Sequence, residues 1–237
     1  EARTKEITDT KSLTVMGRMA SMIAHDLRNA LSTIKMNLQI LNRRHDSPAD
    51  PEQEHCQIGL DQVRYMEQFL SDMLSYARPE EIQSDWCDFG PIVDEAVTAV
   101  SHHLQNNGIE VALELDDDLP KIFCDRHKIL AVMRNVIENA IHSMPDGGAL
   151  TISAAIKMQS SDPWVCVEVS DVGCGIPEDI IGDVMDPFFT TRTKGTGLGL
   201  AIVKGIVERH GGEISLTSDV GVGTRANITL PTGQVNG

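Results

Sequence analysis

Asp171-Val-Gly-Cys-Gly175 and Gly195-Thr-Gly-Leu-Gly-Leu200 are two glycine-rich stretches in the second half of a 237-residue chain. The first follows an alternating apolar run, so it sets a carboxylate beside two residues that let a ligand approach the backbone. The second leads directly into helical periodicity, where exposed N–H groups and partial positive charge favour phosphate. Its glycine order differs from the dinucleotide and Walker motifs, and a tight turn is the alternative.

The segments around these stretches alternate between helical and strand patterns. Helical periodicity marks residues 90–106, 126–144 and 197–210, and alternating or β-branched runs mark 109–115, 149–158, 163–170, 213–218 and 224–230. Such a mixture, with adjacent strands late in the chain, predicts an α/β sandwich in which helices cover a sheet.

Two further features of this half indicate a nucleotide. Asn135 and Asn139 lie one turn apart on the predicted helix 126–144 and share a face. Amide oxygens are hard ligands suited to Mg²⁺, although two surface amides are the alternative. Between the glycine stretches, residues 186–194 carry two aromatics and two cations, Phe188, Phe189, Arg192 and Lys194. A surface loop anchored by the two phenylalanines is the other interpretation of this segment.

The first third of the chain predicts a long helical hairpin. Apolar residues between about 5 and 44 step by three and four, with one extra residue near Leu27 that breaks a strict heptad. Residues 46–51 interrupt the helix, a second helix occupies about 52–78, and Pro79 ends it. A hairpin cannot hide both apolar seams alone, so we expect it to dimerise into a four-helix bundle. His25 is rotated about 200° from Ile23 and Leu27 and points out of this bundle.

The charge distribution supports two domains. The net charge is −15, and residues 1–79 hold ten Lys+Arg against eleven Asp+Glu, whereas the remainder holds ten against twenty-four. Because phosphate backbones are bound by clustered Lys and Arg, this composition argues against nucleic acid as a partner.

Five widely spaced cysteines, none in a C-x-x-C motif, argue against a disulfide framework or a zinc site and favour a reducing compartment. The sequence has no signal peptide and no apolar run long enough for a membrane span. Since the chain begins with Glu1, we expect an excised fragment, cytoplasmic or the cytoplasmic part of a membrane-anchored sensor, with any sensor or membrane segment upstream.

The second half resembles the ATPase domain of histidine kinases, in the GHKL superfamily. The boxes occur in that family's order: an Asn box at Asn135–Asn139, a first glycine box at Asp171–Gly175, a phenylalanine box at Phe188–Phe189 and a second glycine box at Gly195–Gly199, with Gly221-Val-Gly-Thr224 as a closing glycine box. The resemblance implies that Asp171 binds the adenine amine, that Asn139 holds Mg²⁺ with help from Asn135, and that residues 190–194 form a short ATP lid. The implied nucleotide-binding residues are Asn135, Asn139, Asp171, Gly173, Gly175, Phe188, Thr190, Arg192, Lys194, Gly195, Thr196, Gly197, Leu198 and Gly199.

Met22-Ile-Ala-His25-Asp-Leu-Arg-Asn29-Ala-Leu31 resembles the phosphoacceptor box of the same family. The implied catalytic residues are the nucleophile His25, Asp26, which orients the ring through one nitrogen, and Asn29, which orients a water in bifunctional members. The box departs from the family where Asp26 replaces Glu, Asn29 replaces Thr and Ala30 replaces Pro; without that proline the helix lacks the usual cause of a kink. His142, one turn past Asn139, is either a phosphate-contacting cation or a plain surface residue.

These features together predict an α+β chain of two domains: a dimerising, His-bearing helical hairpin at 1–79, and a mixed sheet covered by helices, of the GHKL ATPase type, at 84–237. The expected function is that of a sensor histidine kinase core, which uses ATP and Mg²⁺ to phosphorylate His25 and passes the phosphoryl group to an aspartate of a response regulator, with phosphatase activity left open. The alternatives are a GHKL protein-serine kinase of the anti-sigma type, which the His-bearing hairpin disfavours, and a non-catalytic nucleotide-sensing scaffold, which the intact boxes disfavour.

Overall fold

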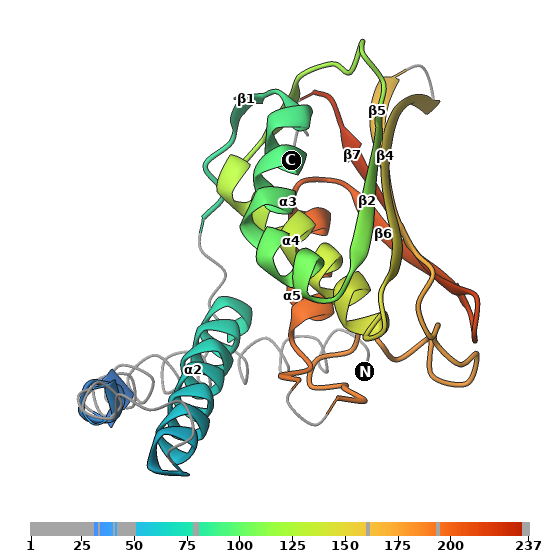
Figure 1. The fold of residues 1–237 in the computed structure, drawn as a ribbon. Helices are drawn as coiled ribbons and strands as arrows, with labels where there is room; N and C mark the ends of the chain where they lie inside the picture. Colours follow the sequence, from blue (N-terminus) through green and yellow to red (C-terminus); the bar gives the residue numbers. More distant parts are fainter. Residues whose placement is uncertain are drawn as a thin grey trace, which may run out of the picture. The chain divides into compact units, whose positions relative to one another are not determined.

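The computed structural model describes residues 31–32, 34–39, 41, 51–77, 81–159, 162–192 and 195–233, with the side chains of the second helix from residue 56 onward. The chain divides into two compact units (Figure 1). One unit contains residues 1–80 with 190–198, and the other contains residues 81–189 with 199–237. Each unit is described by itself below.

The first unit contains the predicted helical hairpin. Helical residues between 31 and 41 are followed by α2 (Pro51–Ala77), which begins at a proline, the residue that a first helical turn tolerates best. A small apolar cluster of Leu31, Val63 and Leu70 forms between the two helices, with Leu38 and Leu74 against it. These residues belong to the apolar seams in the sequence, so the prediction of a hairpin is confirmed.

The second unit is a helix-covered sheet. Its five-stranded sheet has the order β2 (Ile109–Leu115), β4 (Gly148–Gln159), β5 (Asp162–Asp171), β7 (Gly223–Pro231) and β6 (Glu213–Asp219). The β2–β4 pair is parallel and the other three pairs are antiparallel, so the sheet is mixed. Figure 1 shows α3 (Phe89–Asn106), α4 (Arg126–Ser143) and α5 (Gly199–Arg209) together on one face of this sheet. The predicted α/β sandwich is therefore confirmed.

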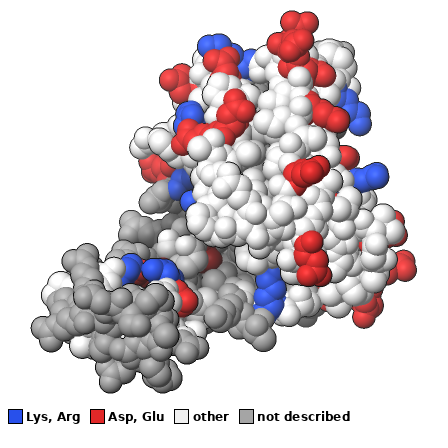
Figure 2. Space-filling model, viewed as in Figure 1, with Lys and Arg blue, Asp and Glu red and all other residues white. Residues whose placement is uncertain are grey.

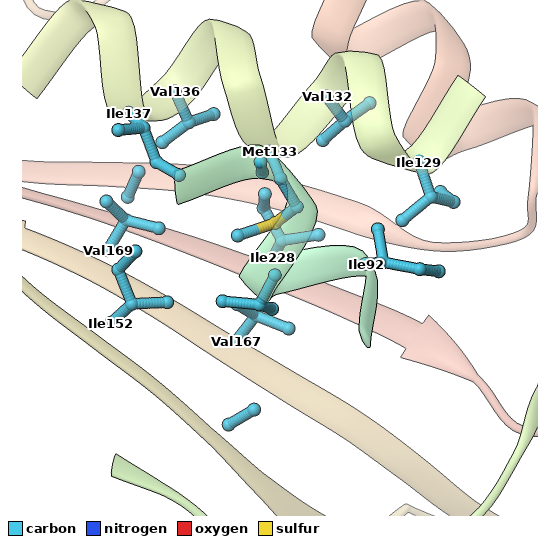
Figure 3. Packing of buried hydrophobic residues seen from close by; sticks show 14 of the residues in the cluster. Ile92, Ile129, Val132, Met133, Val136, Ile137, Ile152, Val167, Val169 and Ile228 are labelled. Carbon is cyan, nitrogen blue, oxygen red and sulfur yellow. The ribbon is translucent and has the colours of Figure 1, made fainter. Parts of the chain in front are cut away.

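The core of this unit lies between the helices and the covered face of the sheet. In Figure 3, Ile129, Met133 and Ile137 of α4 point toward Ile152, Val167 and Ile228 of the sheet. Along β5, Val165, Val167, Val169 and Asp171 are buried in alternation with less buried residues. This period of two follows the pleat of a strand with one covered face, and it brings Asp171 to the same face as the core.

Two short strands were not predicted from the sequence. β1 (Asp85–Cys87) and β3 (Ile122–Cys124) form a separate antiparallel pair, with Trp86 opposite Phe123. The two rings meet edge to face at 5.5 Å between centroids. Since three residues are too few to establish an alternation, the sequence pattern gave no sign of them.

Candidate functional site

One face of α4 carries three polar residues at intervals of four. Asn135, Asn139 and Ser143 are half-buried, whereas Ile137 and Ala140 on the opposite side of the helix are buried in the core. A spacing of four residues puts the polar side chains above one another on one face. The helix is started by Asp125, whose side chain accepts a hydrogen bond from the Lys128 N–H at 3.1 Å.

Asp171 stands at the end of β5 and is only 7% exposed. Its Oδ1 atom accepts hydrogen bonds from the Gly173 N–H at 2.8 Å, the Ser143 hydroxyl at 2.9 Å and the Thr224 N–H at 3.3 Å. A buried carboxylate requires such donors to offset its lost hydration. Three separate segments therefore fix one oxygen of this side chain.

The first and closing glycine boxes pack backbone against backbone. A Cβ atom at Gly223 would lie 1.9 Å from the Asp171 carbonyl oxygen, and one at Gly175 would lie 2.2 Å from the Asp219 carbonyl oxygen. The Gly221 N–H also donates to the Cys174 carbonyl at 2.9 Å. These contacts leave no room for any side chain at Gly175 and Gly223, which explains the glycines there.

The second glycine box, residues 195–199, precedes α5 directly. A Cβ at Gly199 would meet the Asn135 Oδ1 atom at 2.5 Å, so the Asn box and the start of this helix are in contact. Gly197 adopts a φ of +67°, a conformation that favours glycine. Leu198 is buried, and its N–H donates to the Thr196 hydroxyl at 3.3 Å. The arrangement presents a helix N-terminus, which favours anions such as phosphate, beside an amide side chain.

The phenylalanine box does not fit the interpretation that both phenylalanines anchor a surface loop. Phe188 is 60% exposed and has a φ of +68°, which is unusual for a residue with a Cβ. It therefore does not anchor a surface loop by burial, whereas Phe189 is half-buried. In the lid, the Arg192 N–H donates to the Thr190 hydroxyl at 3.1 Å, and Arg192 is exposed. Lys194 lies outside the described residues.

The predicted phosphoacceptor residues His25, Asp26 and Asn29 also lie outside the described residues. His142 is described and exposed, and its Nδ1 atom contacts the Glu138 carbonyl oxygen one turn earlier. This contact holds the ring along the helix, and its exposure is compatible with either predicted role of His142.

Asp125 and His210 form a buried polar pair that sequence reasoning missed. The Asp125 N–H donates to His210 Nε2 at 3.0 Å, and His210 Nδ1 lies 2.8 Å from the Ile206 carbonyl, so this Nδ1 carries the proton of a neutral ring. Burial acts to raise the pKa of the Asp125 carboxyl, but backbone N–H groups, among them those of Gln83 and Lys128, outweigh it and hold this pKa below its usual value. The pair thus joins the start of α4 to the end of α5.

The five cysteines are all free thiols. Burial, together with the neighbouring Cys87 thiol, raises the pKa of the Cys124 thiol to about 12. Cys124 is therefore protonated at neutral pH and chemically inert.

The site has the donor set for Mg²⁺ of the kind that accompanies phosphates. Across the described ranges, no three His, Cys, Asp or Glu side chains gather as a metal site. The Asn135 and Asn139 amides lie on one face of α4, with Asn135 against Gly199 at the start of α5. Amide oxygens beside a phosphate site fit an ion that keeps most of its waters and bridges to phosphate oxygens.

The visible face of the second unit carries Asp and Glu side chains scattered widely over its surface (Figure 2).

No helix in the described part of the chain combines the length and the apolar content needed to cross a membrane.

Two domain families match the chain. Residues 15–82 match the His Kinase A (phospho-acceptor) domain, and residues 124–234 match the histidine kinase-, DNA gyrase B-, and HSP90-like ATPase. Sporulation kinase E of Bacillus subtilis is 30% identical to this chain, and the match covers 97% of this chain and 30% of the relative. The sensor histidine kinase ZraS of Escherichia coli is also 30% identical, and the match covers 95% of this chain and 48% of the relative. The chain thus spans less than half the length of these relatives.

The fold also matches a solved complex. The structure of the histidine kinase ThkA with the response regulator protein TrrA has a TM-score of 0.68, 23% sequence identity, and coverage of 98% of this chain and 66% of that one. At this identity the match supports the fold: a helical hairpin followed by a GHKL-type α/β sandwich.

Proposed function

Because the chain belongs to the sensor histidine kinases and comprises their catalytic core, we propose that it transfers the γ-phosphoryl group of ATP to His25 and then to an aspartate of a response regulator. The observation that carries this proposal is the convergence of Ser143 at the end of α4, the first glycine box and the closing glycine box on Asp171, with Gly199 at the start of α5 against Asn135. The helical hairpin lies in the region that matches the phospho-acceptor domain, and we assign to it the histidine that receives the phosphoryl group.

In the proposed ATP site, the Asp171 carboxylate accepts a hydrogen bond from the adenine amine. The N–H groups at the start of α5 bind the phosphates, with Arg192 and Lys194 of the lid as additional cations. We assign Asn139, with Asn135, to holding Mg²⁺, which when bound neutralises phosphate charge and orients the phosphates. Since phosphoryl transfer depends mainly on positioning and charge neutralisation, these residues need form no covalent bond.

The hairpin supplies the nucleophile. We propose that Asp26 accepts a hydrogen bond from one ring nitrogen of His25, which leaves the lone pair of the other nitrogen free to attack the γ-phosphorus. The bond from this phosphorus to the bridging oxygen breaks and ADP leaves, while the ring proton passes to a base. The phosphoryl group then moves from the nitrogen to a carboxylate of the regulator.

We further propose that the chain acts as a homodimer, divided into domains 1–79 and 84–237. In the single hairpin Ile34, Leu41, Ile58 and Met66 are about half exposed, although an apolar helix face is ordinarily buried. A four-helix bundle with a second hairpin would cover such residues. We also propose that this core works in a reducing compartment, the cytoplasm, and the free thiols and the use of ATP support this proposal.

The nucleophile is tested by labelling the chain with γ-labelled ATP. Label on histidine is lost in acid because phosphoramidates hydrolyse there, whereas label on serine persists. We expect His25→Gln to bind ATP as the parent does and to acquire no acid-labile label. Acid-labile label on the variant would contradict the assignment of His25, and acid-stable label on the parent would favour a serine kinase.

We also propose that Asn29 serves dephosphorylation of the regulator, because its spacing of four residues from His25 predicts a place one turn away on the same face of the expected helix. Asn29→Ala should autophosphorylate near the parent level and should lengthen the lifetime of the phosphorylated regulator in the presence of ADP. If parent and variant leave this lifetime equally short, the amide has no such role; if the parent does not shorten it, the chain is a kinase only.

A further inference from the structure

Ser143 is a polar residue beside Asp171 that the proposed function leaves without a role. It is the last residue of α4 and lies one turn beyond Asn139. Its hydroxyl oxygen is 2.9 Å from Asp171 Oδ1 and 2.7 Å from the Ala140 carbonyl oxygen. A hydroxyl has one hydrogen, and a carboxylate attracts it more strongly than a neutral carbonyl does.

The space around this hydroxyl is closely fitted. A Cβ atom at Gly173 would lie 2.2 Å from Ser143 Oγ, so the glycine is what admits the serine hydroxyl to this place. The Cys174 N–H, moreover, donates to the Ser143 carbonyl at 3.0 Å. Both the side chain and the backbone of Ser143 therefore hold the first glycine box.

The three donors to Asp171 all contact one oxygen. Ser143, Gly173 and Thr224 donate to Oδ1, so the plane of the carboxylate is set before any ligand binds. The Oδ2 atom is then the carboxylate oxygen that can accept a hydrogen bond from a ligand. Ser143 is the one side chain among the three donors, and it can be changed without altering the backbone.

We infer that Ser143 is a positioning residue for base recognition: its hydroxyl fixes Asp171 Oδ1 so that Oδ2 accepts the 6-amino group of a purine. The inference rests on the proposed nucleotide site and adds what makes that site selective for a 6-aminopurine. Without the hydroxyl, the carboxylate loses a donor and reorients more freely, and the loss concerns only ligands that carry the 6-amino group.

The experiment compares two triphosphates on the full chain: ATP, and purine riboside triphosphate, which lacks the 6-amino group. Ser143→Ala should weaken the binding of ATP roughly 3- to 10-fold, as expected for one hydrogen bond, and should leave binding of the analogue within about twofold of the parent, because the missing bond acts only through that amino group. The selectivity between the two ligands falls accordingly.

Ser101→Ala is the matched control. The Ser101 hydroxyl donates to the Thr98 carbonyl three residues earlier at 2.8 Å, as that of Ser143 can to Ala140, but Ser101 is exposed on α3. This variant should bind both ligands as the parent does. An equal loss for both ligands in Ser143→Ala, or no loss for ATP, would overturn the inference; a parent chain that binds no ATP would instead refute the proposed function.

Discussion

Asp125 forms hydrogen bonds with three segments of the α/β unit. It accepts from the Gln83 N–H at 3.0 Å and from the Lys128 N–H at 3.1 Å, and its own N–H donates to His210. Since the folded-state pKa of its carboxyl is lowered, the ionised side chain stabilises the fold above the ordinary aspartate pKa near 3.8, and this contribution is lost as the pH falls through the folded-state value.

Asp125→Asn should accordingly lower the free energy of unfolding by about 1–2 kcal/mol at neutral pH, because an amide nitrogen replaces one acceptor. The difference between parent and variant should shrink as the pH falls below the ordinary aspartate pKa near 3.8 and on through the lowered folded-state pKa, where the parent carboxyl also becomes neutral. Urea unfolding followed by tryptophan fluorescence at several pH values measures it. A difference that does not change with pH would show that the charge contributes nothing.

The sequence could predict residues whose chemistry is carried by a motif, but not those whose role depends on a neighbour from another element. The sequence predicts a site role for Asp171 from its place between a strand and two glycines, and for the Asn pair from its spacing. It predicts none for Ser143, although this residue continues the Asn135–Asn139 interval of four, because its partner arrives from β5. His210 is a histidine at a helix end, and nothing near it in the sequence indicates that its ring contacts the start of α4.

At the scale of elements, α4 has a buried apolar face in the core and a half-buried polar face to which we assign ligand binding. Ile137 is fully buried in the core, while Asn139 lies on the polar face. Ile137→Ala should cost about 2–5 kcal/mol in the free energy of unfolding, as a cavity in a packed core does. Asn139→Ala should leave the free energy of unfolding near the parent value and lower autophosphorylation by orders of magnitude, since it removes the oxygen that we propose as a ligand of Mg²⁺.

Urea denaturation and the rate of label incorporation from ATP separate the two effects. The folded fraction of Ile137→Ala should retain its affinity for ATP. Equilibrium binding at low temperature, without denaturant, measures this affinity. A stable Asn139→Ala variant with activity within a few-fold of the parent would contradict the assignment of that residue.

Secondary structure was predictable where periodicity persisted over enough residues. β2 has the predicted bounds, and the strands of the large sheet and its three helices differ from prediction by few residues. The small β1–β3 pair escaped because the pairing of short strands depends on tertiary neighbours, here the Trp86–Phe123 contact. The conformation of Phe188 was unpredictable for the same reason, since local preference alone disfavours its positive φ.

At the scale of the whole molecule, the two units have separate hydrophobic cores. Leu31, Val63 and Leu70 form one cluster, and a much larger cluster fills the α/β unit. A unit with its own core can fold alone. Residues 81–237, produced as a separate chain, should therefore unfold cooperatively and bind ATP within a few-fold of the full chain.

This piece lacks His25, so it should acquire no acid-labile label by itself. Calorimetric titration with ATP and the labelling assay check both expectations. If residues 81–237 are unfolded, or fold without binding ATP, the proposed division into an independent ATPase domain at 84–237 is wrong.

β5 is paired on both sides along most of its length, with β4 and with β7, and Asp171 is its final residue. Amide hydrogens in such a strand exchange with solvent only when the sheet comes apart, whereas loops exchange through small local openings. In the described structure, residues 195–198 of the second glycine box belong to no strand or helix. We therefore expect the amide hydrogens of β5 next to Asp171 to exchange at the rate of global unfolding, and those of residues 195–198 to exchange much faster.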